Sequence, residues 1–216
     1  MQATRYASRE MSRRQIVTSF DALLKPFANG VNALCFERNL AGDFEHIAAS
    51  LAPHAKDGVL EVDESMLRGF DERAVKVLLE DLEKLTALGR EPQLNVITRY
   101  PRDERGLAMS IDVHSFHVDR APIEADTFLC TYAGASSEGL DNDDAERLLD
   151  DPQIAEALRG DEFAELHFRA KPGAVSYSFG LGNLWRVAVD WPGSSVLPCI
   201  HRAPPHDDRP RLLLIA

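Results

Sequence analysis

The sequence has little that would place the protein in a membrane or outside the cell. Its 216 residues include three cysteines, Cys35, Cys130 and Cys199, which are too few and too far apart for a disulfide framework. No Cys-x-x-Cys pair indicates a structural zinc site. The chain also lacks the roughly 18 consecutive apolar residues that a membrane-spanning helix needs, and its first thirty residues hold no apolar stretch of signal-peptide length. We therefore expect a cytoplasmic protein that does not enter a membrane.

Positive charge is also scarce. The chain has 24 Lys and Arg against 35 Asp and Glu, a formal net charge of −11. Such a surface repels a phosphate backbone, which argues against a general nucleic-acid binder. The acidic residues are dense at 141–165, where only Arg147 and Arg159 oppose them, and we expect this segment to be a solvated helical insert.

The chain is long enough for one substantial core and short for two, so a single domain over residues 1–216 is expected. Residues 1–90 are predicted to be mainly helical. The best-defined helix covers 71–88, because its apolar residues recur at spacings of three and four, Asp71 can cap its start and Gly89 suits its end. Further helices are expected at 43–52 and 9–24, with a short strand at 31–36.

The pattern changes after Pro92 to short strands separated by turn residues such as Lys171-Pro172-Gly173. No helices alternate with the last four strands, which excludes a parallel α/β sheet and the dinucleotide-binding fold with it. The pattern is instead typical of an antiparallel sandwich or barrel over residues 91–216, interrupted by the acidic insert at 139–163. The expected strands are 94–100, 107–113, 127–132, 164–169, 174–179, 184–189, 196–200 and 211–215.

A candidate metal site lies in the run Phe116-His117-Val118-Asp119. Residues two apart in an extended chain project from the same face, so His117 and Asp119 can reach one point. His201 lies 84 residues beyond His117, near the end of another expected strand, and strands distant in sequence can be neighbours in a jelly roll. Two histidines and one carboxylate on one side of iron(II) leave other coordination positions open, as oxygen activation requires.

These residues, with Arg211 ten positions after His201, resemble the pattern of iron(II)- and 2-oxoglutarate-dependent dioxygenases. The sequences around them are more specific. Phe116-His117-Val118-Asp119, the run Cys130-Thr131-Tyr132-Ala133-Gly134, and His201-Arg202-Ala203-Pro204 resemble an uncharacterised bacterial family with Phe-His-x-Asp, Cys-Thr-Tyr-x-Gly and His-Arg-x-Pro motifs. The resemblance covers about residues 95–216. It implies an α+β protein whose core is a double-stranded β-helix, a jelly-roll or cupin-like fold, with the N-terminal helices packed on it.

The resemblance implies a role for each site residue. His117, Asp119 and His201 would bind Fe(II), and the planar guanidinium of Arg211 would pair with the distal carboxylate of 2-oxoglutarate. Tyr132 is a further candidate for that carboxylate, although a core role with its hydroxyl satisfied is an equal alternative. The sequence departs from the pattern in having Leu213 where many such enzymes have serine or threonine, and Arg209 competes with Arg211 as the anchor.

Other assignments stay open at this stage. Cys199, two residues before His201, would favour zinc and a non-catalytic protein for metal sensing or storage, unless it is simply a buried core residue. His114 reaches the site only through a bulge, and His167 and His206 have no partners by spacing. The expected substrate is a small molecule or peptide of unidentified chemistry, and the oligomeric state is not indicated by the sequence.

Overall fold

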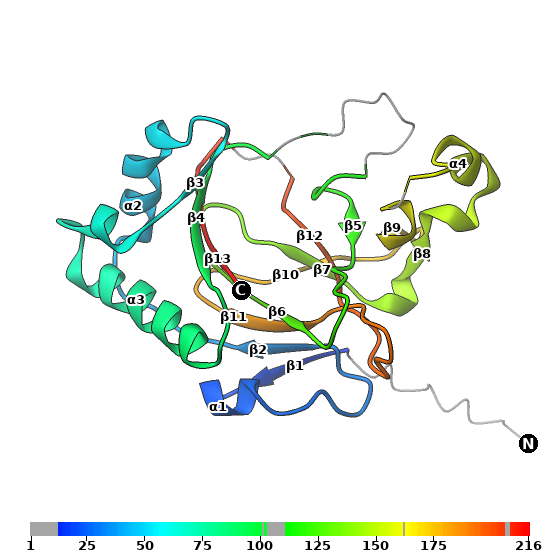
Figure 1. The fold of residues 1–216 in the computed structure, drawn as a ribbon, viewed down its shortest axis with the longest axis horizontal. Coiled ribbons are helices and arrows are strands. Elements are labelled where there is room, and N and C mark those ends of the chain that lie inside the picture. The colour runs from blue at the N-terminus through cyan, green and yellow to red at the C-terminus, as the bar shows by residue number, and fades with distance from the viewer. Residues whose placement is uncertain (1–12, 101, 103–110, 162, 206–207) are drawn as a thin grey trace, which may run out of the picture.

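The computed structural model describes residues 13–100, 102, 111–161, 163–205 and 208–216. Two largely antiparallel sheets face each other, and the larger one curls as a half-barrel (Figure 1). Helices α3 (Glu72–Ala87) and α2 (Phe44–Leu51) cover the outer face of this larger sheet, and α4 (Pro152–Ala157) lies beside the smaller sheet. The fold is therefore α+β, as the sequence predicted, with a β-sandwich arrangement.

The larger sheet has seven strands in the order β1-β2-β11-β6-β13-β4-β3. All of its neighbouring pairs are antiparallel except β1 and β2. The strands are β1 (Arg14–Val17), β2 (Ala33–Phe36), β3 (Val59–Glu61), β4 (Gln93–Ile97), β6 (Asp126–Ala133), β11 (Leu184–Ala188) and β13 (Arg211–Ile215).

The smaller sheet has six strands in the order β10-β7-β12-β5-β9-β8, all of them antiparallel to their neighbours. The strands are β5 (Phe116–His117), β7 (Glu138–Leu140), β8 (Ala145–Arg147), β9 (His167–Ala170), β10 (Tyr177–Ser178) and β12 (Ile200–Arg202). The helices are α1 (Phe20–Leu23), α2 (Phe44–Leu51), α3 (Glu72–Ala87) and α4 (Pro152–Ala157), with short 3₁₀ turns at Ala52–His54, Glu64–Leu67, Asn142–Asp144, Leu148–Asp150 and Ala164–Leu166.

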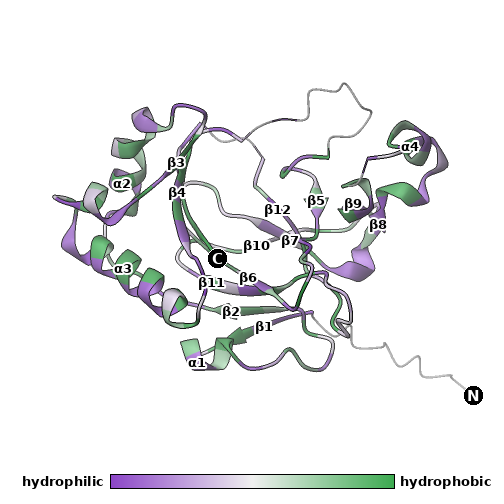
Figure 2. Cartoon of the chain, viewed as in Figure 1, coloured by the Kyte–Doolittle hydropathy of each residue, from purple (hydrophilic) through white to green (hydrophobic). Residues whose placement is uncertain are grey.

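Helix α3 forms where the sequence predicted it. The Asp71 side chain accepts a hydrogen bond from the Arg73 backbone N–H at its start, and Gly89 follows its end at φ +75°. Hydrophobic and hydrophilic residues alternate along its ribbon (Figure 2). Its apolar residues, including the fully buried Leu78 and Leu85, pack against the larger sheet, which is what holds the helix in place.

A buried ion pair also joins α3 to the larger sheet. Both Nη1 contacts of Arg38 to the Asp81 carboxylate are 2.7 Å, and the Tyr132 hydroxyl donates to Asp81 Oδ2 at 2.8 Å. Nη2 of Arg38 lies 3.4 Å from the sulfur of Cys130. Burial followed by the nearby sulfur and carboxylate raises the pKa of Tyr132, so this hydroxyl stays protonated and can donate.

Strand β13 separates the helical core from the space between the sheets. Leu212 and Leu214 are fully buried in the core under the helices, whereas Arg211, Leu213 and Ile215 point the other way and line a cavity. This alternation follows from the strand period of two residues. The side of β13 that faces the smaller sheet is therefore the side available for a functional site.

Several sequence predictions were wrong in detail. The helix expected at 9–24 is strand β1 followed by the one-turn helix α1, for the part from residue 13 onward. The N-terminal part also contributes β2 and β3 to the larger sheet, so it is less helical than expected. Among its described residues, the insert at 139–163 has a single α-helix, the short α4, together with two 3₁₀ turns and the edge strand β8 at residues 145–147. Residues 111–113 of the strand expected at 107–113 are irregular. None of the helices in the described ranges is both long and apolar enough to cross a membrane.

Candidate metal centre

The three predicted metal ligands meet between the two sheets. His117 ends β5 and His201 lies at the middle of β12, directly opposite it in the antiparallel pair. Asp119 follows β5 by two residues and faces the same way as His117. Their neighbours Phe116, Val118 and Ile200 point to the opposite face and form a separate apolar cluster, so strand alternation brings the three ligands to one side.

The distances suit one metal ion. One ligand atom from each of His117, Asp119 and His201 lies within 4.8 Å of the others. Nε2 of His201 is 3.7 Å from Oδ1 of Asp119, and the two imidazole centroids are 4.8 Å apart. Atoms that bind a common metal at about 2.0–2.2 Å lie roughly 3–4 Å from each other, so small side-chain movements complete the coordination.

Hydrogen bonds orient all three ligands toward the shared point. Nδ1 of His117 lies 2.9 Å from the Ser115 carbonyl, and Nδ1 of His201 lies 3.3 Å from the Cys199 carbonyl. A carbonyl only accepts, so each Nδ1 carries a proton, and in the neutral form of either ring the free lone pair is on Nε2. The Thr127 hydroxyl donates to Oδ2 of Asp119 at 2.7 Å, which leaves Oδ1 free. Such outer hydrogen bonds are typical of metal sites.

Protonation favours the same use. The pKa of His117 is lowered to about 4, first by burial and then by the neighbouring His201. Burial alone would raise the pKa of Asp119, but His201 and the Thr127 hydrogen bond outweigh it, and the net direction is downward. At neutral pH the site therefore offers a neutral imidazole at His117 and an ionised carboxylate, the forms that bind a divalent cation.

The ligands line a cavity of about 350 Å³ between the sheets. Its walls come from β4, β6 and β13, and Arg211 lies on the same wall as Leu213. His117 and Asp119 also line a second, more open hollow of about 620 Å³ beside β5 and the start of β9, together with Phe163 and His167. The ligand group is thus reachable from two directions.

Arg211 is buried, with 5% of its surface exposed, and its charge has no acidic counterpart within ion-pair distance among the described residues. Nη1 donates to the Tyr100 hydroxyl at 2.6 Å, and Nη2 donates to the hydroxyls of Thr131 and Ser137 at 3.2 and 3.1 Å. Nε has no hydrogen-bond partner in the part of the chain that the structure describes. Burial lowers the pKa of Arg211, which records the cost of an uncompensated buried charge. An anion is the ligand that this environment favours.

A glycine makes room for this arginine. Gly134 has φ +76°, and a Cβ there would lie 2.6 Å from the Pro210 carbonyl oxygen and 3.1 Å from Cγ of Arg211. The Cys-Thr-Tyr-x-Gly motif therefore ends at a position where any side chain would displace the arginine.

Tyr132 does not reach the cavity. Its side chain lies on the opposite face of β6, in the core with Asp81 and Arg38. This is the core role, with the hydroxyl hydrogen-bonded, that the sequence analysis gave as the alternative. The hydroxyls that contact Arg211 belong instead to Tyr100, Thr131 and Ser137. A register shift in the pairing of β6 with β13 next to Leu212 adds to the difference, because it turns both Tyr132 and Ala133 toward the helical core.

Cys199 lies in an apolar cluster with Phe179 and Trp185, and burial raises the pKa of its thiol to about 12. It is therefore a protonated core residue and not a member of the ligand group. Trp185 is likewise a core residue. Arg209 is exposed at the rim of a neighbouring pocket and does not line the ligand cavity, so Arg211 is the better placed of the two arginines.

The remaining histidines take other positions. Nδ1 of His114 lies 2.9 Å from the Pro204 carbonyl, outside the ligand group. Nδ1 of His167 lies 2.7 Å from Oγ of Ser115, the residue whose carbonyl holds His117, so His167 supports the site indirectly. His206 lies outside the described residues.

Sequence reasoning missed Thr127, Ser115 and Tyr100. Thr127 carried a usable signal, because it begins an expected strand and shares its parity with Leu129 and Thr131. Tyr100 follows its strand by three residues, where alternation no longer applies.

Comparisons with protein-family models, curated proteins and solved structures each gave no match for this chain.

Proposed function

We propose that the protein is an iron(II)- and 2-oxoglutarate-dependent oxygenase. The observation that carries the proposal is a single cavity lined by His117, Asp119 and His201 and, on another wall, by the buried Arg211, which has no acidic partner among the described residues. A metal and a small dicarboxylate would satisfy both halves of this cavity. The resemblance of the motifs to that enzyme superfamily supports the same conclusion.

The strand order supports the finer proposal that the core is a double-stranded β-helix. Eight strands, β4 to β7 and β10 to β13, provide β4, β13, β6 and β11 as consecutive neighbours in one sheet and β5, β12, β7 and β10 in the other. Jelly rolls have eight strands distributed over two sheets in this manner. The candidate ligands would then lie on neighbouring strands of the smaller sheet and the anchor on the larger one.

Each group would have a distinct role. The free Nε2 atoms of the two histidines and Oδ1 of Asp119 would hold the iron, and the guanidinium of Arg211 would hold the distal carboxylate of 2-oxoglutarate. Bound iron with the keto acid supplies oxygen activation, with the oxidation of substrate coupled to decarboxylation of 2-oxoglutarate. The protein fixes the protonation state of the ligands, orients the dicarboxylate and limits access of water through the apolar Leu129 and Leu213.

The second hollow, beside β5, would give the substrate that is to be oxidised its own path to the metal. His117 and Asp119 line it together with Phe163, which is 57% exposed. A substrate bound there would reach the metal without displacing a dicarboxylate held in the inner cavity by Arg211. Two approaches to one metal suit a reaction in which cosubstrate and substrate bind together.

The proposal is tested by adding iron(II) and 2-oxoglutarate to the purified protein and measuring succinate. We expect succinate only when iron(II), 2-oxoglutarate and oxygen are all present. His117→Ala should abolish it, whereas the matched control His54→Ala, which removes an exposed histidine far from the site, should not. Succinate formation by His117→Ala equal to that of the wild-type protein would refute the assignment.

Binding gives a readout even when turnover without substrate is slow. Arg211→Met keeps an unbranched apolar side chain in place of the arginine stem but removes the guanidinium. We expect it to weaken 2-oxoglutarate binding to the iron-loaded protein roughly 10- to 100-fold, the value of a charged hydrogen-bonded contact. Iron binding itself should persist, since Arg211 is not a ligand. Unchanged 2-oxoglutarate affinity would contradict the anchor role.

A second candidate is a non-catalytic metal-binding protein. The observation in its favour is Leu213, an apolar residue on the cavity wall beside Arg211 at the position where related enzymes have a hydroxyl for the dicarboxylate. Metal analysis after purification without added metal separates the two functions. A bound metal, abolished by His117→Ala, with no affinity for 2-oxoglutarate would favour this second function.

A further inference from the structure

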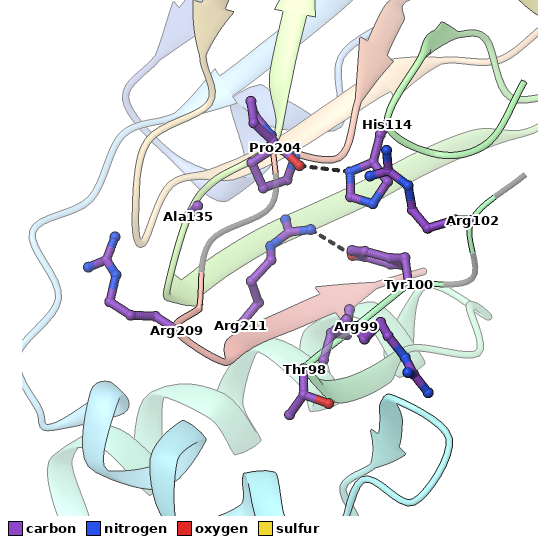
Figure 3. Close-up of a pocket in the computed structure, with 11 residues that line it drawn as sticks. Thr98, Arg99, Tyr100, Arg102, His114, Ala135, Pro204, Arg209 and Arg211 are labelled. Carbon is purple, nitrogen blue, oxygen red and sulfur yellow. Dashed lines mark hydrogen bonds between the residues drawn. The ribbon is translucent and has the colours of Figure 1, made fainter. Parts of the chain in front are cut away.

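A separate pocket lies on the other side of Arg211 from the cavity lined by His117, Asp119 and His201, which we call the metal cavity. It has a volume of about 320 Å³ and is formed by the end of β4 and the residues after it, by Ala135, and by the segment that follows β12. Figure 3 shows Arg211 at its centre, with its guanidinium directed toward Tyr100, and His114 joined to the Pro204 carbonyl above it. Arg211, Tyr100 and Ile97 line both this pocket and the metal cavity, so they form the partition between them.

The charge of the pocket is opposite to that of the protein. Four arginines line it, Arg99, Arg102, Arg209 and Arg211, and none of its described lining residues is acidic, in a chain whose formal net charge is −11. Arg102 is paired with Asp112 at 3.6 Å at the edge of the pocket. Arg99 and Arg209 are exposed and extend outward from the rim (Figure 3). Their positive charges at the entrance attract an anion toward the pocket.

The interior of the pocket is mainly apolar. Ile97, Ala135, Pro204 and Pro205 form its walls, and the Tyr100 and His114 rings meet edge to face with centroids 5.5 Å apart. Arg211 at its base is buried, has no acidic partner among the described residues and keeps an unpartnered Nε. The pocket thus combines an apolar interior with cationic groups at the base and rim.

We propose that this pocket binds a small organic acid with an apolar body. Its carboxylate would pair with Arg211, and the positive charges of Arg99 and Arg209 at the rim would add to the attraction. A guanidinium binds a carboxylate through two parallel N–H···O contacts, and the apolar walls suit a ring or short alkyl chain. The site is distinct from the metal centre, and its occupation requires no metal. It therefore stands whether or not the protein is an oxygenase.

Sharing Arg211 makes the two cavities compete. A carboxylate bound in this pocket uses donors of the same guanidinium that faces the metal cavity, so an acid here should weaken a dicarboxylate there, and the reverse must hold to the same extent. This consequence, unlike the site itself, rests on the proposed function. It would make the proposed reaction sensitive to the level of an organic acid.

The test uses benzoate as the anionic probe and benzamide as its neutral counterpart of similar shape. Binding is measured calorimetrically on the full-length protein in excess chelator, so that chelation to iron cannot contribute. We expect benzoate to bind and benzamide to bind at least 10-fold more weakly. The double variant Arg99→Ala/Arg209→Ala should weaken benzoate binding several-fold, while the control Arg68→Ala, which removes an equally exposed arginine elsewhere, should leave it unchanged.

The outcomes separate this site from the metal centre. Benzoate binding that responds to the double variant supports the acid site even if no succinate is formed from 2-oxoglutarate. Equal affinities for benzoate and benzamide, no binding of benzoate, or equal effects of the double variant and Arg68→Ala would each overturn it. In the iron-loaded protein, the double variant should still bind 2-oxoglutarate as the wild type does, because neither rim arginine lines the metal cavity.

Discussion

Thr127 provides a direct test of how the candidate metal ligands are oriented. Its hydroxyl donates a 2.7 Å hydrogen bond to Oδ2 of Asp119 and leaves Oδ1 available to a metal ion. Thr127→Val replaces that hydroxyl by a methyl group of similar size and preserves the branched side chain that suits β6. The carboxylate then loses its only side-chain hydrogen bond among the described residues and can rotate away from the site.

The magnitude follows from measured effects of outer-shell hydrogen bonds in metal sites. Their removal lowers metal affinity about 10- to 100-fold, which corresponds to about 1.4–2.7 kcal/mol. Loss of the bond also raises the pKa of Asp119, because the Thr127 hydrogen bond is one of the interactions that lower it. Protons then compete better for the carboxylate, so the loss of affinity should grow as the pH falls.

Titration of the metal-free protein with a divalent metal measures this effect. Thr127→Val should bind 10- to 100-fold more weakly than wild type, and Thr127→Ser, which keeps the hydroxyl, should restore most of the affinity. Thr86→Val, an exposed substitution on α3, controls for the change of residue type. Equal metal affinity of Thr127→Val and wild type would refute the argument that Thr127 holds Asp119 for the metal.

Three further predictions concern stability. Asp81→Asn should lower the free energy of unfolding, measured in urea, by about 3–5 kcal/mol, because it leaves Arg38 charged and buried without its partner. Tyr132→Phe should lower it by about 1–2 kcal/mol and leave metal and 2-oxoglutarate binding unchanged. Weaker 2-oxoglutarate binding in Tyr132→Phe would contradict the place of Tyr132 in the core. The pKa of His117 is lowered to about 4 in the folded protein, against an ordinary value of 6.5. Between these pH values the unfolded chain is protonated at His117 and the folded protein is not. The free energy of unfolding of the metal-free protein should therefore fall by up to about 3 kcal/mol as the pH falls from 6.5 to 4. His117→Gln should remove that part of the pH dependence, and an unchanged profile would show that His117 is not responsible.

The parts of the structure that could be predicted from sequence are those that depend on local pattern. Helix α3 has an amphipathic period, an aspartate at its start and a glycine after its end, and its bounds agree with the prediction within one residue. Strand β13 was predicted with its observed bounds. The position of His117 and Asp119 on one face followed from the strand period alone, and their proximity to His201 is confirmed by the ligand distances.

What could not be predicted depends on partners that are distant in sequence. Residues 14–17 have no strong pattern of their own and become a strand because they pair in parallel with β2. Residues 145–147 were read as helical from their charge, but pairing with β9 makes them an edge strand. Tyr100 reaches Arg211 across 111 residues of sequence, and no spacing rule connects the two.

Strand β6 explains why the two candidate residues of its motif had different outcomes. Thr131 and Tyr132 are adjacent, both bear hydroxyls and both are buried, so composition cannot distinguish them. Thr131 faces Arg211 and the cavity, whereas Tyr132 faces Asp81 and the helices. Because β6 is buried on both faces, its sequence lacks the polar and apolar alternation that would reveal its orientation. The orientation is fixed instead by what each face must satisfy: a buried guanidinium needs hydroxyls on one side, and a buried carboxylate needs donors on the other. The same strand therefore carries residues of the candidate metal site on one face and residues of the core on the other, which is why substitutions at Thr127 and Tyr132 should separate the two.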